Sequence, residues 1–166
     1  MHVTTAGHHA LLIMLDLAIH GQDAPVARQD ISGRQGISGD YIAQLMGRLH
    51  KAGLVESVMG PGGGYVLSLP ASQVRVGDII RAIEGPIETR YCVAPDPEGS
   101  CPHKETCLTH ALWVELSTVI DIYLNGITLQ NLWDRSPQLE HINLSGFDLA
   151  REDSYKPIFT PKYPKN

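Results

Sequence analysis

Three cysteines and one histidine stand close together in the second half of this 166-residue chain. They follow the pattern Cys92-x8-Cys101-x5-Cys107-x2-His110, in which x is any residue. Three thiolates and one imidazole can bind a tetrahedral zinc ion, or they can supply the four terminal ligands of a two-iron cluster. The spacing alone does not choose between zinc and iron, although the chain lacks the closely paired ligands that zinc fingers favour.

A loop and the start of a helix must position these four residues. Residues 86–104 show no periodicity and contain four prolines, so we expect an ordered loop only if the cysteines tie it down. Cys107 and His110 lie at the start of a predicted helix, where a spacing of three residues directs both side chains to one face. Three buried free cysteines are the simplest alternative, but free cysteine favours apolar burial and this loop is polar.

The cysteine count also indicates a compartment. An odd, clustered number of cysteines without an export signal favours a reducing environment over a disulfide framework, so we expect a cytoplasmic protein. The most apolar run, residues 10–19, is too short to span a bilayer and contains Asp16. We therefore expect no membrane partner.

The first half of the chain has the pattern of a helix-turn-helix. One helix is predicted from Thr4 or Thr5 to Gly21, and a short weak helix is predicted over 29–35. Ser38 is a predicted N-cap for a third helix, which closes at Gly53. Its apolar stripe is formed by Tyr41, Ile42, Leu45, Met46 and Leu49. A short helix, a glycine-containing turn and a stronger capped helix are typical of this DNA-binding unit.

Two predicted strands follow the third helix. Residues 54–58 and 65–69 are rich in aliphatic side chains, and the glycine-rich segment 59–64 joins them as a hairpin. This segment is not a nucleotide-binding loop, because no Lys-Ser/Thr pair follows it and it leads into a strand. We therefore predict a mainly α fold, with a winged helix-turn-helix domain, a two-stranded β wing and a long dimerisation helix.

The rest of the chain is predicted to serve association. A short helix is predicted over 76–84, and a broad apolar face over 106–125 exceeds what a small winged helix can cover, which indicates a second copy. Thr128 is a predicted cap for a last helical turn. The predicted organisation is a DNA-binding domain, a cluster-binding loop, a dimerisation helix with a short terminal helix, and an extended or disordered tail, at 1–85, 86–106, 107–135 and 136–166.

Charge and motifs limit the function classes. Thirteen Lys and Arg against eighteen Asp and Glu give a net charge of -5, so any DNA contact must be local. Residues 1–70 contain four basic and five acidic side chains. No His-Glu-x-x-His helix or nucleophile motif is present, so we expect no enzyme.

DNA reading is predicted for the exposed face of the third helix and for the wing. Ser38 and the helix N-terminus can bind a phosphate, Gln44 can pair with adenine, and Arg48 can reach a phosphate or guanine. The alternative is an ordinary solvated helix face. The candidate contacts are Ser38, Asp40, Ala43, Gln44, Arg48, Lys51, Met59, Gly60, Gly62 and Gly63.

Four segments carry a resemblance to a known family. They are 30–38, the wing 60–65, Cys107 to Trp113, and 125–129, and together they resemble the IscR-type winged-helix regulators over residues 1–135. The resemblance implies a homodimeric transcription regulator that binds a double-stranded DNA operator and carries one [2Fe-2S] cluster per subunit. It implies that the cluster ligands are Cys92, Cys101, Cys107 and His110.

The chain departs from this family at positions that affect DNA binding. Relatives usually begin with Lys-Gly-Arg-Tyr where this chain has the sequence Ala-Gly-His-His at 6–9. They usually place Arg where Met59 stands, and an acidic residue occurs where Ala43 stands. The resemblance therefore implies neither an operator sequence nor a DNA affinity for this chain.

Three other functions remain open. Relatives that sense nitric oxide bind a [4Fe-4S] cluster through three cysteines and a carboxylate of the neighbouring subunit, near position 8. This chain has His8 at that position and His110 is available, so a ligand set within one subunit is favoured. His8 and His9 are otherwise expected to be solvated residues at a helix start. The second is a small electron-transfer protein, and the third is a zinc-stabilised interaction module.

Overall fold

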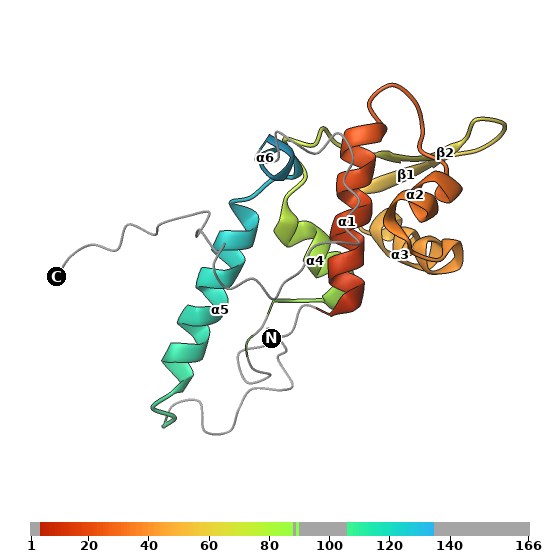
Figure 1. Ribbon diagram of the computed structural model, residues 1–166. Helices are drawn as coiled ribbons and strands as arrows, with labels where there is room; N and C mark the ends of the chain where they lie inside the picture. The colour runs from red at the N-terminus through yellow and green to blue at the C-terminus, as the bar shows by residue number, and fades with distance from the viewer. Residues whose placement is uncertain (1–3, 88, 90–105, 135–166) are drawn as a thin grey trace, which may run out of the picture.

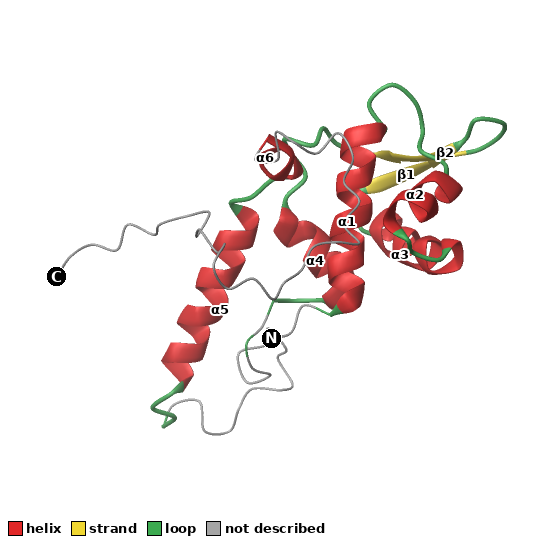
Figure 2. Ribbon diagram, in the orientation of Figure 1, coloured by secondary structure: helices red, strands yellow, loops and turns green. Residues whose placement is uncertain are grey.

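The computed structural model describes residues 4–87, 89 and 106–134. Within these residues the chain forms helices and one two-stranded antiparallel sheet (Figure 2). The elements are α1 (Thr5–His20), α2 (Arg28–Gln35), α3 (Gly39–Lys51), β1 (Val55–Val58), β2 (Gly64–Leu67), α4 (Val76–Glu84), α5 (His110–Asn125) and α6 (Leu129–Asp134). In Figure 1, α1 lies in the middle, with α2, α3 and the wing on one side and α5 on the other.

Side-chain caps set the helix starts that the sequence predicts. The Thr4 hydroxyl accepts a hydrogen bond from the backbone N–H of Ala6, and the Ser38 hydroxyl accepts one from the N–H of Tyr41. Thr128 and Asn131 cap α6 reciprocally, because each side-chain oxygen accepts a hydrogen bond from the other residue's N–H. Each bond pairs an amide that would otherwise lack a partner in the helix.

The wing is a short hairpin attached to the loop before α2. Val55 pairs with Leu67 and Val58 with Gly64, and an isolated bridge joins Val26 to Tyr65. Each strand is one residue shorter than predicted: β1 begins after Leu54, and β2 begins at Gly64 but ends before Ser68. Gly60 and Gly62 have φ of 100° and 76°, so the chain leaves the strand conformation between β1 and β2. The connecting loop therefore extends away from the domain (Figure 1).

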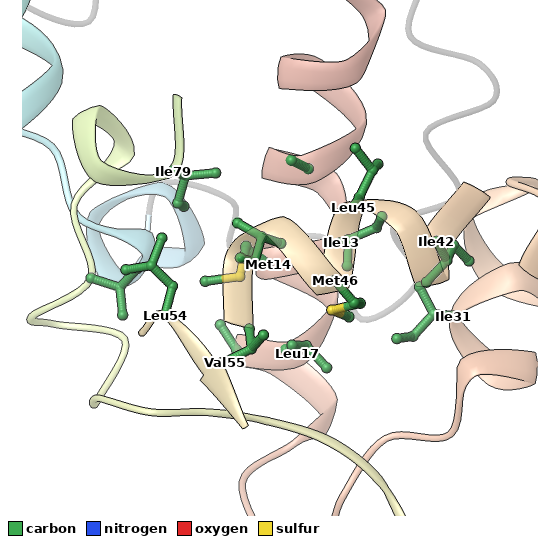
Figure 3. Packing of buried hydrophobic residues seen from close by; sticks show 14 of the residues in the cluster. Ile13, Met14, Leu17, Ile31, Ile42, Leu45, Met46, Leu54, Val55 and Ile79 are labelled. Carbon is green, nitrogen blue, oxygen red and sulfur yellow. The ribbon is translucent and has the colours of Figure 1, made fainter. Parts of the chain in front are cut away.

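The hydrophobic core lies between α1, α3 and the elements around them. Ile13, Met14 and Leu17 of α1 lie in one buried cluster with Leu45 and Met46 of α3 (Figure 3). Ile31 of α2, Ile42 of α3, Val55 of β1 and Ile79 of α4 belong to the same buried cluster. This core holds the helix-turn-helix and the wing together, as the winged-helix prediction requires.

The start of α5 differs from the prediction. The helix begins at His110 rather than near residue 106, so Cys107 precedes the helix. Thr109 has αR backbone angles and makes no side-chain cap, and its hydroxyl lies 3.4 Å from the Cys107 Sγ. The Thr109 hydroxyl therefore contacts the Cys107 thiol and not a backbone N–H of the helix. Residues 88, 90–105 and 135–166 lie outside the described residues, so the predicted loop order, tail and domain boundaries stay predictions.

A buried ion pair joins α1 to α2. The Asp16 carboxylate is fully buried, and it accepts hydrogen bonds from Arg34 Nε at 2.9 Å and from Arg34 Nη2 at 2.6 Å. The Gln35 amide donates a third bond to it at 2.8 Å. This arrangement accounts for the acidic residue within the most apolar run of the sequence.

We expect Arg34→Leu to lower the free energy of unfolding by about 3 kcal/mol, because the Asp16 carboxylate would stay buried with only the Gln35 amide as partner. Chemical denaturation at pH 7 measures this loss. The double variant Asp16→Leu/Arg34→Leu is the control and should recover most of the stability, since no unpaired charge remains. A loss below about 1 kcal/mol in the single variant would mean that water reaches Asp16 after truncation.

Candidate nucleic-acid interface and metal centre

The outer face of α3 presents most of the predicted DNA contacts. Ile42, Leu45, Met46 and Leu49 are buried on the opposite face and fix the rotation of the helix. Ser38, Asp40, Gln44, Arg48 and Lys51 are exposed, and Ala43 is half-buried. The structure therefore brings these six residues to one surface, with the helix N-terminus at one end.

Two arginines of this domain form side-chain contacts within the protein. Arg34 pairs with Asp16, and the Arg48 Nη2 donates a hydrogen bond to the backbone carbonyl of Ile83 in α4. Neither bond could be predicted, because the partners lie 18 and 35 residues away in the sequence. The cations left for phosphate contacts are fewer than the sequence count of four.

Arg28 is a candidate contact outside the set predicted from sequence. It is exposed at the start of α2, and a Cβ built on Gly39 would lie 3.5 Å from its Nε, so its side chain passes the N-terminus of α3. A cation beside free helix amides favours an anion such as a phosphate. A sequence signal existed, because Arg28 is one of only four basic residues in the first 70.

The wing tip carries no charge. Met59 is 90% exposed, and Gly60, Pro61 and Gly62 are exposed beside it, whereas Gly63 is half-buried. The Gly63 N–H donates to the Gly60 carbonyl at 2.9 Å and closes a tight turn. The tip can therefore approach DNA through backbone amides and an apolar side chain.

Cys107 and His110 are brought together by a turn. The His110 N–H donates to the Cys107 carbonyl at 3.2 Å, and the Thr109 hydroxyl hydrogen-bonds the Cys107 thiol. That side-chain hydrogen bond lowers the pKa of Cys107 and favours the thiolate that metals bind. His110 Nδ1 is buried without a hydrogen-bond partner among the described residues. A soft thiolate and an unpaired imidazole nitrogen fit an iron or zinc centre.

The other two predicted ligands, Cys92 and Cys101, lie outside the described residues. Within the described part of the chain, no group of three or more His, Cys, Asp or Glu side chains could hold a metal ion. Cys107 and His110 therefore form half of the predicted ligand set. No helix in that part is long and apolar enough to cross a membrane.

The face of α5 that points away from α4 is apolar and exposed. None of the sixteen residues of α5 is buried. Leu112, Leu116, Val119 and Tyr123 follow the spacing i, i+4, i+7 and i+11, so they form one stripe. A single copy leaves this stripe in contact with water.

His9 is not the solvated residue that the sequence predicts. Its ring lies edge-on to Tyr41 of α3, with ring centroids 5.8 Å apart, and its Nδ1 is buried without a partner among the described residues. Burial, with the neighbouring His8 as the second cause, lowers the pKa of His9. His9 therefore joins α1 to α3, whereas His8 is exposed.

A helix-turn-helix with an exposed recognition helix and a wing defines the chain as a winged-helix DNA-binding protein. The family model described as "Rrf2: Iron-dependent Transcriptional regulator" matches residues 3–135. The chain belongs to the Rrf2 family.

Relatives and solved structures agree with this assignment. HTH-type transcriptional regulator IscR of Yersinia enterocolitica is 43% identical over 157 residues, which cover 95% of this chain and 94% of the relative. The solved structure of T. potens IscR has a TM-score of 0.66 and 34% identity, and the match covers 84% of this chain and 91% of that one. The structure of CymR, the global cysteine regulator of B. subtilis, has a TM-score of 0.65 and 32% identity, covering 81% and 98%. The chain is a DNA-binding transcription regulator of the IscR type, and these relatives are not enzymes.

Proposed function

We propose that the chain is a homodimeric regulator whose operator binding is controlled by a [2Fe-2S] cluster on Cys92, Cys101, Cys107 and His110. The observation that supports this best is the turn 107–110, which carries the Cys107 thiol and a His110 imidazole whose Nδ1 is buried without a partner among the described residues. The iron dependence in the description of the family adds support. When bound, such a cluster supplies a one-electron centre whose state reports iron–sulphur or redox status.

The ligand residues would also position the cluster relative to α5. His110 is the first residue of this helix and Cys107 precedes it by one turn, so cluster binding would order the chain before α5. An imidazole ligand is neutral and can be protonated, which raises the reduction potential above that of an all-thiolate cluster. A sensor benefits from such a responsive cluster.

DNA recognition is proposed for α3 and the wing. Ser38 and the amides at the start of α3 would bind a phosphate, with Arg28 beside them. Gln44 would pair with adenine, Asp40 would accept from the cytosine amino group, and Ala43 would contact a thymine methyl. Lys51 would bind a phosphate, and Arg48 would reach DNA only by leaving Ile83. The wing contacts would be Met59, Gly60, Gly62 and Gly63.

The proposed partner of α5 is the same helix in a second copy of the chain. Pairing the stripe of Leu112, Leu116, Val119 and Tyr123 with itself would remove it from water in both copies. The dimer would then present two recognition helices to a palindromic operator, with half-sites about one helical turn or a multiple apart. Its place of action would be the cytoplasm, where the chromosome of its bacterial relatives lies.

A DNA titration with and without the cluster tests this function. The chain is purified without oxygen, its visible spectrum is recorded, and it is titrated onto a palindromic duplex library before and after removal of the cluster. We expect a red-brown protein with a sequence preference that changes between the two states. A colourless zinc protein would refute the iron proposal, and an equal preference in both states would remove the sensor.

We expect the salt dependence of DNA binding to be shallow, because few cations remain to contact phosphates. Arg28 and Lys51 supply two per subunit, so four phosphates in a dimer predict a slope of log affinity against log salt of about −4. Arg28→Ala should reduce the magnitude of this slope by about 2, whereas Gln29→Ala, an exposed neutral neighbour, should leave it unchanged. A wild-type slope steeper than about −6 would show that other cations bind the backbone.

A further inference from the structure

The last turn of α4 contacts three other helices through Arg81, Ile83 and Glu84. The Ile83 carbonyl accepts the hydrogen bond from Arg48 of α3. The Glu84 carboxylate accepts hydrogen bonds from the Thr4 hydroxyl at 2.6 Å and from the Gly7 N–H at 3.0 Å, at the start of α1. Arg81 faces α5. This turn therefore links the recognition helix to α1 and to α5.

Arg81 connects this turn to α5 by two side-chain contacts. Its Nη1 lies 2.5 Å from the Asp121 carboxylate, and its Nη2 donates to the Asn125 side-chain oxygen at 2.6 Å. Asp78, within α4, holds the same guanidinium at 2.6 Å. A planar guanidinium group that hydrogen-bonds three partners is held in one orientation, so Arg81 fixes α5 against α4.

Arg48 is suited to a similar role at the other contact. The last carbonyls of a helix have no partner within it, and a cation is favoured at that end. The Arg48 guanidinium satisfies one of these carbonyls in α4 while its own helix presents the predicted DNA contacts. Its bond is therefore formed before DNA arrives, and a direct DNA contact would break it.

We propose that Arg48 and Arg81 are positioning residues for DNA recognition, which hold α3 at a fixed offset from α5 through the last turn of α4. This inference rests on the proposed pairing of α5 with a second copy. In such a dimer the distance between the two α3 helices is set along the path from α5 through α4 to α3. That distance determines the separation of half-sites that the dimer accepts.

The test compares Arg48→Met and Arg81→Met with the wild-type chain on duplexes that the wild type selects from a random palindromic library. Each selected duplex is also prepared with the centre lengthened or shortened by one or two base pairs. Affinities are measured at several salt concentrations, and sedimentation checks that each variant stays dimeric. Methionine keeps the apolar stem of arginine and removes the guanidinium.

We expect both variants to lose about tenfold in affinity at the selected spacing and to discriminate less between spacings. The slope of log affinity against log salt and the base preferences within each half-site should not change. Arg81 lies between α4 and α5, so the same effect from both residues is not what a direct DNA contact of Arg48 would produce. Arg48→Lys should restore part of the spacing preference, because an ammonium can still donate to the Ile83 carbonyl.

Three outcomes would overturn the proposal. If Arg48 binds a phosphate, Arg48→Met lowers the magnitude of the salt slope by about 2 per dimer. If Arg48 reads a base, the base preference relaxes at one position of each half-site and the spacing preference stays. If the wild-type chain selects no duplex, the proposed function fails and this inference with it.

Lys51→Met is the control for these measurements. Lys51 lies on the exposed face of α3, so its loss should change the salt slope and not the spacing preference.

Discussion

Cys107→Ser is expected to abolish the visible absorbance of the protein purified without oxygen. The thiol is held in a turn with His110, and losing one of three thiolates leaves too few anionic ligands to retain iron. His110→Ala should instead leave a weak, unstable absorbance, because three thiolates can still hold the irons while water fills the fourth position. Visible spectroscopy and iron analysis on matched protein concentrations measure both effects.

Leu108→Ala is the control for this experiment. Leu108 stands beside Cys107 but is 98% exposed, so truncation removes no packing and should leave the absorbance unchanged. Circular dichroism of each variant separates ligand loss from unfolding. Full absorbance in Cys107→Ser would exclude this thiol as a ligand, and a colourless wild type that contains zinc would favour the interaction module.

Local signals in the sequence predict most of the described fold. Residue type and position predict caps at Thr4 or Thr5, at Ser38 and at Thr128, and the structure has Thr4, Ser38 and Thr128 as the caps. A cap bonds with residues two or three positions away, so the information lies within one turn. The apolar stripe of α3 likewise fixes which face is buried and therefore which face can meet DNA.

Contacts between distant segments could not be predicted in this way. From sequence alone, an arginine on a helix of this domain is a candidate phosphate contact. In the structure, Arg34 pairs with Asp16 of α1, and Arg48 donates a hydrogen bond to the Ile83 carbonyl of α4. Only the packing of α2 against α1 and of α3 against α4 brings these partners together. Arg28 shows the opposite case, because the turn between α2 and α3 brings its side chain to the recognition helix.

Val119→Glu is expected to weaken dimerisation by at least about 1,000-fold. Val119 lies in the middle of the α5 stripe and is 58% exposed in one copy, so pairing would bury it. Each subunit would then bury one unpaired carboxylate, at several kcal/mol each, and every 1.4 kcal/mol is a factor of ten in the dissociation constant. Sedimentation measured across micromolar concentrations should show a dimer for the wild type and a monomer for the variant.

The monomeric variant should stay folded, because no residue of α5 belongs to the buried core. Thr118→Glu is the matched control: Thr118 is exposed on the same helix but lies off the stripe, so an added carboxylate there should remain in water and leave the dimer intact. Operator affinity should fall with the dimer in Val119→Glu, since each half-site would then be bound separately. A dimer that survives Val119→Glu would place the interface on another surface, and the path from α5 through Arg81 to Arg48 would no longer set the half-site spacing.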